Sequence, residues 1–257
     1  MIAYDVSGND RGPVLVLLHG VGLDRAMWDR CLPALERDHH VVRMDLRGHG
    51  GSAPAAPGTT LADLAGDVSA VLDEVGADTV HLVGFSLGAL VAQRLSVDQP
   101  QRVSSLTLVS SVAVRTPDER AAVAARLRAA EADFPATVEA AVSRWFDDDW
   151  AAREPELVES VRRTLLGNDR SSYLASYRVF ATADAEIAPL LGSIQAPTLV
   201  ITGSDDPGST PEMTFRLERA VPHARAEIVA GARHLLPIER ADEFVNALSK
   251  HIERTQS

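Results

Sequence analysis

Short apolar runs alternate along the chain with stretches whose apolar positions recur at helical spacing. The apolar runs are continuous and rich in β-branched residues, which is typical of parallel strands covered on both faces. They span Pro13–Leu18, His40–Met44, Thr79–Val83, Ser105–Val109 and Thr198–Ile201, with a shorter run at Ala226–Val229. The helical stretches span Asp24–Glu36, Leu61–Val75, Ser86–Asp98, Pro211–Val221 and Pro237–Ile252. This alternation predicts a doubly wound α/β fold, with a mostly parallel central sheet and helices on both faces.

The alternation stops between about Val112 and Leu190, where no strand is predicted. Four helices are predicted there instead, at Pro117–Asp133, Pro135–Trp145, Glu156–Leu166 and Ser171–Phe180. The sequence Thr116-Pro117-Asp118-Glu119 is a good signal for a helix start. We therefore expect a helical lid at residues 112–190, inserted over the sheet edge where ligands bind in such folds. The core would then comprise residues 1–111 and 191–257.

Composition and charge narrow the possible partners. The 257 residues are 46% hydrophobic and 24% charged, and the net charge is −11. This charge disfavours nucleic acid and anionic membrane surfaces as partners. No signal-peptide pattern is seen and no apolar run approaches the roughly 20 residues that span a bilayer, so a cytoplasmic location is expected. Cys31 is the single cysteine, expected to be a buried structural thiol. The sequence does not indicate an oligomeric state.

A serine lies in a glycine-flanked turn between a predicted strand and a predicted helix, in the sequence Gly84-Phe85-Ser86-Leu87-Gly88. A G-x-S-x-G sequence in this setting is typical of a turn that exposes a nucleophile. Side chains at the glycine positions would crowd the turn, which holds the serine in strained backbone geometry. The helix that follows aims free N–H groups and the positive end of its dipole at the same place. We therefore expect Ser86 to be a nucleophile beside an anion-stabilising pocket.

A serine hydroxyl needs a histidine base and a carboxylate that orients this base. His234, in Gly231-Ala232-Arg233-His234, is the candidate base. Asp205 and Asp206 both follow the strand at Thr198–Ile201, and spacing alone does not choose between them. The order serine, acid, histidine along the chain is the one expected for this kind of turn.

A second glycine-containing loop, His19-Gly20-Val21-Gly22, follows the first strong strand. We expect the N–H groups of Val21 and Leu87 to form an oxyanion hole, with Gly22 as the alternative to Val21. His19 is expected to hold the loop in place, and the polar turn Asp45–Ser52 to be structural. Neither glycine cluster matches a phosphate-binding loop, and no group of residues has persuasive zinc spacing. No metal and no cofactor are therefore expected.

These motifs resemble those of the α/β-hydrolase superfamily, over nearly the whole chain. The resemblance rests on His19-Gly20, Asp45–Ser52, Gly84–Gly88, Gly203–Asp206 and Gly231–His234. It implies the α/β-hydrolase fold and a serine–histidine–aspartate triad, and it favours Asp206 because the family's acid is the third residue after the glycine. Only twelve residues precede Pro13, where the family usually has a further strand. Whether the sheet lacks its first edge strand is therefore left open.

Within the superfamily, the chain is most similar to 3-oxoadipate enol-lactone hydrolases, bacterial enzymes of aromatic-compound catabolism. The similarity is carried by Ser143-Arg144-Trp145-Phe146, the turn Asp45–Gly50 and Ala196–Ile201. It implies that Arg144 and Trp145 contact the carboxylate and the ring of a substrate from the lid; the alternative is ordinary lid packing, with Trp145 in the core. Residues 113–190 contain ten Arg against fourteen Asp and Glu, so an anionic substrate would need one specific arginine.

The expected reaction is a two-step acyl transfer that cleaves an ester or lactone of a small substrate. Other members with such a triad are alternatives, namely broad carboxylesterases, C–C bond hydrolases and cofactor-free perhydrolases. Dehalogenases and epoxide hydrolases are disfavoured, because they would need an aspartate at position 86. A signalling or partner-binding member with slow turnover is a further alternative, since the stretch from His19 to Asp24 is similar to such proteins. Rapid multiple turnover would separate an enzyme from such a receptor.

Overall fold

The computed structural model describes residues 1–112 and 114–255; Ala113, Gln256 and Ser257, which fall within the predicted lid and core ranges, lie outside these. Its strands are β1 (Tyr4–Gly8), β2 (Val14–Leu18), β3 (His40–Met44), β4 (Val80–Phe85), β5 (Val103–Val109), β6 (Thr198–Gly203) and β7 (Ala224–Val229). They form one sheet in the order β1-β3-β2-β4-β5-β6-β7. β1 pairs antiparallel with β3, whereas the other pairs are parallel. The six parallel strands therefore end at the same edge.

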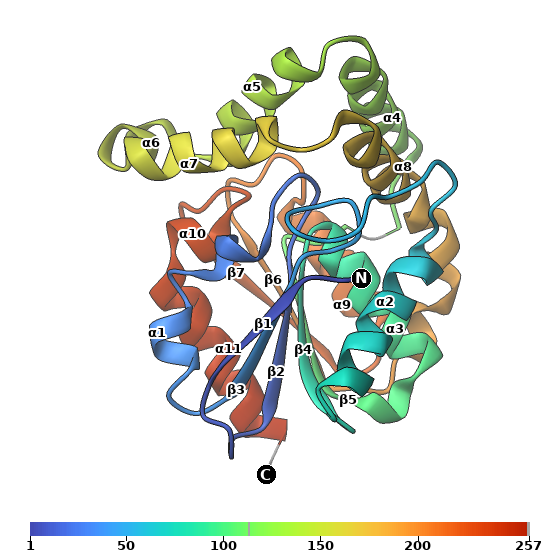
Figure 1. Ribbon diagram of the computed structural model, residues 1–257, viewed down its shortest axis with the longest axis vertical. Helices are drawn as coiled ribbons and strands as arrows, with labels where there is room; N and C mark the ends of the chain where they lie inside the picture. The colour runs from blue at the N-terminus through green and yellow to red at the C-terminus, as the bar shows by residue number, and fades with distance from the viewer. Residues whose placement is uncertain (113, 256–257) are drawn as a thin grey trace.

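Helices cover both faces of this sheet, which confirms the predicted doubly wound α/β fold. They are η1 (Arg25–Trp28), α1 (Leu32–Leu35), α2 (Leu61–Glu74), α3 (Leu87–Asp98), η2 (Pro100–Arg102), α9 (Pro211–Ala220), α10 (Leu236–Glu239) and α11 (Ala241–Thr255). Figure 1 shows α2 and α3 on one side of the sheet and α1 and α11 on the other. All six residues of β4 and nine of the twelve residues of α3 are buried. The strand and helix that flank Ser86 thus lie in the most enclosed part of the protein.

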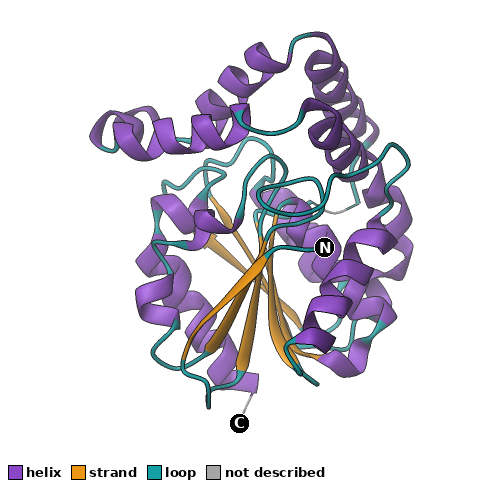
Figure 2. Cartoon of the chain, in the orientation of Figure 1, coloured by secondary structure: helices purple, strands orange, loops and turns teal. Residues whose placement is uncertain are grey.

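Among the residues that the structure describes, five helices lie between β5 and β6, at α4 (Pro117–Ala132), α5 (Phe134–Trp145), α6 (Asp148–Arg153), α7 (Pro155–Leu166) and α8 (Arg170–Ile187), and η3 (Ala188–Ser193) follows them. We refer to α4–α8 as the inserted helices. Figure 2 shows them beyond the end of the sheet where many loops gather. The Thr116 side chain accepts the Glu119 N–H while the Glu119 carboxylate accepts the Thr116 N–H, so the predicted helix start is confirmed.

The structure differs from the predicted elements in four places. The expected helix at Asp24–Glu36 is wrong, because proline is tolerated only in a helix's first turn and Pro33 accordingly lies in the first turn of the separate helix α1. The expected helix at Pro237–Ile252 is divided near Arg240 into α10 and α11. The short helix α6 was not predicted, because the pattern of its apolar residues does not indicate a helix. β1 lies at the sheet edge and none of its five residues is fully buried, so it lacks the continuous apolar run of an inner strand. An edge strand is therefore present before Pro13.

Cys31 lies beside a contact between the core and the inserted helices. Its side chain is buried, Sγ lies 3.4 Å from the carbonyl oxygen of Pro237, and burial raises the pKa of the thiol to about 12. The structural role expected for this thiol is confirmed.

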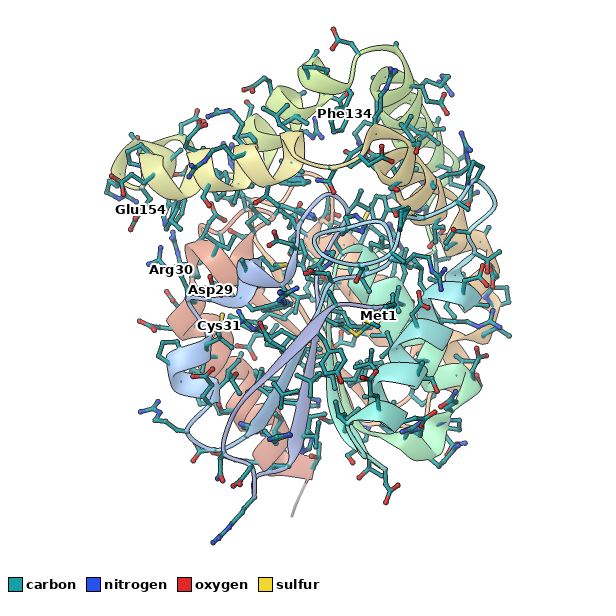
Figure 3. The ribbon with its side chains drawn as sticks, in the orientation of Figure 1. Met1, Asp29, Arg30, Cys31, Phe134 and Glu154 are labelled. Carbon is teal, nitrogen blue, oxygen red and sulfur yellow. The ribbon has the colours of Figure 1, made fainter. Side chains whose placement is uncertain are left out.

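The neighbouring Arg30 faces Glu154 at the start of α7, with 3.7 Å between Nη1 and Oε1 (Figure 3). No helix within the described residues is both long and apolar enough to cross a membrane.

Candidate active site

Ser86 occupies a sharp turn between β4 and α3. Its backbone has φ 53° and ψ −108°, a conformation that is uncommon for residues other than glycine. A Cβ atom at Gly84 would lie 2.3 Å from the carbonyl oxygen of Gly88, and one at Gly88 would lie 2.5 Å from that of Leu18. Only glycine, which has no Cβ atom, therefore allows the backbone to approach this closely at these two positions. They let the strand, the turn and the helix pack tightly around Ser86, which is only 6% exposed.

The loop after β2 is bound directly to this turn. The Gly88 N–H donates to the carbonyl oxygen of His19 at 3.0 Å, and a Cβ at Gly20 would lie 2.8 Å from the Phe85 ring. Val21 lines the same cavity as Ser86, whereas Gly22 is not among the described residues that line it. Leu87 is the first residue of α3, so helical hydrogen bonding leaves its N–H without a partner. The two candidate oxyanion donors thus flank the serine.

His19 fixes the position of this loop. Its Nε2 accepts the Leu46 N–H at 2.8 Å, which requires Nδ1 to carry the proton that it donates to the Gly20 carbonyl oxygen at 2.7 Å. Burial lowers the pKa of the imidazole, so the ring stays neutral with both nitrogens paired. The expectation that His19 holds the loop is confirmed.

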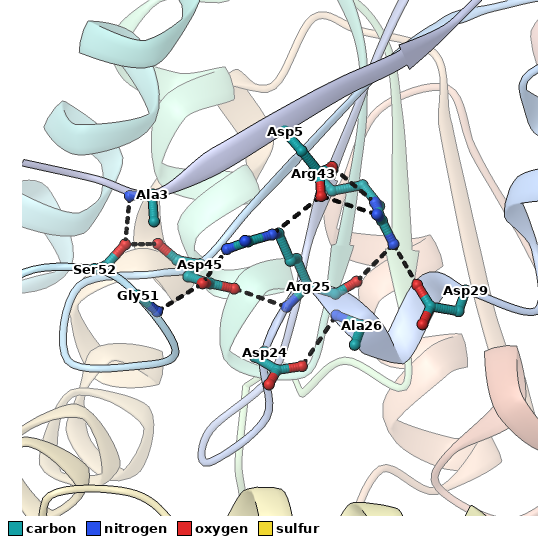
Figure 4. Close-up of polar contacts among 10 residues, drawn as sticks. All are labelled: Ala3, Asp5, Asp24, Arg25, Ala26, Asp29, Arg43, Asp45, Gly51 and Ser52. Carbon is teal, nitrogen blue, oxygen red and sulfur yellow. Dashed lines mark hydrogen bonds and ion pairs between the residues drawn. The ribbon is translucent and has the colours of Figure 1, made fainter.

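The polar turn after β3 is also structural, as expected. Asp45 accepts the Arg25 and Gly51 N–H groups, each at 2.9 Å, and pairs with the Arg25 guanidinium (Figure 4). Arg25 also contacts Asp5, which binds Arg43 in turn. The Asp45 carboxylate is thus occupied by the protein's own donors. The described residues contain no group of three or more histidine, cysteine or acidic side chains that could hold a metal.

Two loops at the ends of β6 and β7 bring an acid and a histidine together. His234 Nδ1 donates to Asp206 Oδ2 at 2.7 Å, while Asp206 Oδ1 accepts the N–H groups of Gly208 and Ser209 at 2.8 and 2.9 Å. Burial raises the pKa of Asp206, but the His234 charge and these hydrogen bonds lower it more, so the net shift is downward. Asp205, by contrast, is exposed and accepts the Ser204 hydroxyl at 2.7 Å.

A cavity lies over Ser86 and His234. Its floor comes from the core loops, and its opposite wall comes from the inserted helices through Arg126, Thr137, Ala141, Arg144, Trp145, Tyr173, Tyr177 and Phe180. The Trp145 ring centroid lies 5.6 Å from that of His234, so Trp145 both packs against the histidine and faces the cavity. Arg144 is half-buried, and burial lowers the pKa of its guanidinium. The structure therefore brings all seven predicted site residues to one place.

Arg126 is a cavity residue that the sequence analysis misses. Val123 and Ala130 are the buried residues of α4, and Arg126 lies three residues after the first and four before the second. At helical spacing this puts Arg126 on the buried face. An arginine at helical spacing from Val123 and Ala130 is the signal that could have revealed it.

Glu239 links the histidine loop to the inserted helices. Its Oε1 accepts the Asp147 N–H at 3.0 Å and its Oε2 accepts the Arg233 N–H at 2.7 Å, although burial raises the pKa of this carboxyl. Arg233 Nη1 donates to the Phe146 carbonyl oxygen at 2.6 Å. These bonds join the residue before His234 to the end of α5, where Arg144 and Trp145 lie.

Comparisons with known proteins agree with this architecture. Residues 13–241 match the family model described as alpha/beta hydrolase fold. The chain is 31% identical over 257 residues to 3-oxoadipate enol-lactonase 1 of Acinetobacter baylyi, covering 99% of this chain and 94% of that protein. It is 30% identical over 244 residues to (E)-2-((N-methylformamido)methylene)succinate hydrolase of the same organism, covering 95% and 92%. The crystal structure of the enol-lactonase from Burkholderia xenovorans LB400 superimposes with a TM-score of 0.89 at 28% identity, covering 98% of this chain and 96% of that one.

Proposed function

This chain belongs to the α/β-hydrolase fold family, and we propose that it is a serine hydrolase that cleaves an ester or lactone bond through Ser86, His234 and Asp206. The observation that carries the proposal is the 2.7 Å contact of His234 Nδ1 with Asp206 beside the strained turn of Ser86. With its Nδ1 proton directed at Asp206, the imidazole keeps Nε2 free to accept a proton. This is the tautomer that a base for serine requires.

The reaction would proceed in two steps. His234 takes the proton of Ser86 while the hydroxyl oxygen attacks the carbonyl carbon, and the Val21 and Leu87 N–H groups bind the resulting oxyanion. The leaving oxygen then takes the proton from His234, which leaves an acyl-enzyme on Ser86. In the second step His234 activates a water molecule, which releases the acid and restores the serine hydroxyl. Asp206 holds the tautomer of His234 and stabilises its protonated form.

The proposed substrate is a small carboxylate-bearing ester or lactone, similar to 3-oxoadipate enol-lactone. Arg144 supports this assignment, because it lines the cavity half-buried and forms no hydrogen bond or ion pair within residues 1–112 and 114–255. A guanidinium in that state is suited to bind a carboxylate. The names of two relatives, an enol-lactonase and a hydrolase of a succinate derivative, agree with it. We also propose that residues 112–190 act as a lid that carries this arginine and Trp145.

The test is steady-state turnover of 3-oxoadipate enol-lactone beside short-chain 4-nitrophenyl esters. Ser86→Ala removes the nucleophile, so we expect kcat to fall by roughly 10⁴-fold or more on every substrate. Ser104→Ala, at an exposed position of β5, is the matched control and should turn over normally. Normal turnover by Ser86→Ala would disprove the nucleophile. Efficient cleavage of neutral esters without lactone turnover would keep the triad and reject the substrate.

A further inference from the structure

Two arginines from different helices line the cavity without acidic partners. Arg126 comes from α4 and Arg144 from α5, both half-buried, and neither forms a hydrogen bond or ion pair with any described residue. Elsewhere in the inserted helices, arginines are paired, as Arg162 is with Glu139 and Arg178 with Glu131. Some other arginines of the inserted helices also lack an acidic partner among the described residues, but these are exposed to water, as Arg128, Arg153 and Arg163 are.

The charge of the pair is not neutralised inside the cavity. Asp206 is the acidic residue among the described lining residues, and both its oxygens are held by His234 and by backbone N–H groups. Burial lowers the pKa of Arg144, and the like charge of Arg126 lowers it further. Two guanidiniums that share a partly enclosed space repel each other, so an anion placed there would be bound strongly.

Neutral donors complete the same wall. Tyr173 and Tyr177 line the cavity, and within the described residues neither hydroxyl has a hydrogen-bond partner. Burial raises the pKa of Tyr173, so its hydroxyl keeps its proton and can donate. The wall therefore offers two guanidiniums and two hydroxyls, a set of donors that matches carboxylate oxygens.

We propose that Arg126 and Arg144 together select a substrate whose acyl part carries two carboxylates, with Arg126 binding the second of them. One carboxylate can pair with one guanidinium group. A substrate with a single carboxylate would therefore leave the other arginine without a charged partner. A dianion neutralises both arginines. This inference rests on the proposed function and narrows its substrate class to monoesters or lactones whose acyl part keeps two free carboxylates, as in a monoester of a tricarboxylic acid.

The test uses three 4-nitrophenyl esters whose acyl parts differ in charge. These are the neutral butyrate ester, the singly charged hemisuccinate and the doubly charged monoester of tricarballylate. The wild-type protein should prefer the dianion, with kcat/KM about tenfold or more above that of the monoanion. Arg126→Gln should lower the dianion-to-butyrate ratio of kcat/KM by 10- to 100-fold, and the monoanion-to-butyrate ratio by much less. Arg144→Gln should lower both ratios.

Arg128→Gln is the matched control, because it removes the same charge from the exposed side of the same helix. It should leave both ratios unchanged. An equal loss in Arg126→Gln and Arg128→Gln would overturn the proposal, since it would show a long-range charge effect. A wild-type preference for the monoanion would also overturn it.

A separate measurement keeps this proposal distinct from the proposed function. If none of the three esters is cleaved, binding of tricarballylate itself is measured by calorimetry, and the serine hydrolase assignment fails if 3-oxoadipate enol-lactone is not turned over either. Binding that is weakened at least tenfold by Arg126→Gln, and not by Arg128→Gln, would support the two-carboxylate site. Absence of tricarballylate binding to the wild-type protein would overturn it.

Discussion

The core and the inserted helices form opposite walls of one cavity, and they do so by different means. On the core side, backbone contacts set the geometry: positions Gly84, Gly88 and Gly203 leave no space for a Cβ atom, the last because it would lie 2.0 Å from the carbonyl oxygen of Ala232. On the inserted side, long side chains from α4, α5 and α8 reach into the cavity, and two of them are arginines that pair with no described residue.

Because of this difference, one wall of the cavity would serve the reaction and the other the selectivity for a substrate. Catalytic groups need positions held within a fraction of an ångström, which closely packed backbone provides. Selectivity for a substrate needs charges and shapes that can change without disturbing that geometry. Side chains on helices outside the sheet supply these, so the core would determine the reaction and the inserted helices the substrate.

Gly88→Ala should break the core side most severely. The new Cβ would lie 2.5 Å from the carbonyl oxygen of Leu18 and 2.6 Å from that of His19, and neither backbone atom can turn away. We expect a loss of about 3–5 kcal/mol in the free energy of unfolding, measured by urea denaturation. Gly66→Ala, inside α2 with nothing within 4 Å, is the control and should gain about 0.5–1 kcal/mol. Equal stabilities of the two variants would contradict the close-packing argument.

The second prediction uses the histidines, all eight of which lie outside residues 113–190. Burial lowers the pKa of His81 and of His251 to about 4, and that of His49 to about 3. Between about pH 6.5 and pH 4 the unfolded chain takes up protons at these positions and the folded chain does not. The free energy of unfolding should therefore fall as the pH falls, by about 2 kcal/mol per buried histidine at pH 5.

Urea denaturation at pH 7 and pH 5 measures this effect. His251→Gln keeps a donor for the Leu106 carbonyl oxygen, which His251 Nε2 contacts at 3.2 Å, and should reduce the difference between the two pH values. His223→Asn is the control, because His223 is exposed and asparagine tolerates its φ of 55°. An unchanged pH difference in His251→Gln would show that the pH sensitivity arises elsewhere.

The same contrast explains what could be predicted from the sequence. The turn at Ser86 leaves a local signature, because its close contacts exclude every residue except glycine at Gly84 and Gly88. His234 and the carboxylates follow strand ends, which a parallel sheet brings to one edge. Asp205 and Asp206 are adjacent in sequence, and only the spatial contact with His234 distinguishes them, although the family resemblance favoured Asp206.

The inserted helices could not be predicted to the same depth. The sequence predicts that α4 exists, but which of its faces is buried, and against which partner, depends on how helices pack in three dimensions. Arg126 was therefore missed, whereas Arg144 was found only through the family resemblance. The roles of these residues stay proposals, which the charged esters test.

Glu239→Gln should weaken the connection between the two walls. An amide can accept one of the two N–H groups, but its own NH₂ would then face the other donor, from Asp147 or Arg233. We expect kcat/KM to fall about three- to tenfold, and thermal unfolding to occur a few degrees lower. Glu243→Gln, exposed on α11, is the matched control. Unchanged kinetics in Glu239→Gln would mean that the histidine loop is held independently of the inserted helices.

The smallest effect is expected at the surface pair of Arg30 and Glu154, which also joins the two regions. Their side chains are 39% and 42% exposed and 3.7 Å apart, so water screens most of their attraction. In a double-mutant cycle with Arg30→Ala and Glu154→Ala, the coupling should be below about 0.5 kcal/mol. Each variant should retain its kcat/KM, in contrast with Glu239→Gln. A coupling above about 1 kcal/mol would show that surface charge also holds the inserted helices on the core, and that the buried bonds of Glu239 are not the main connection.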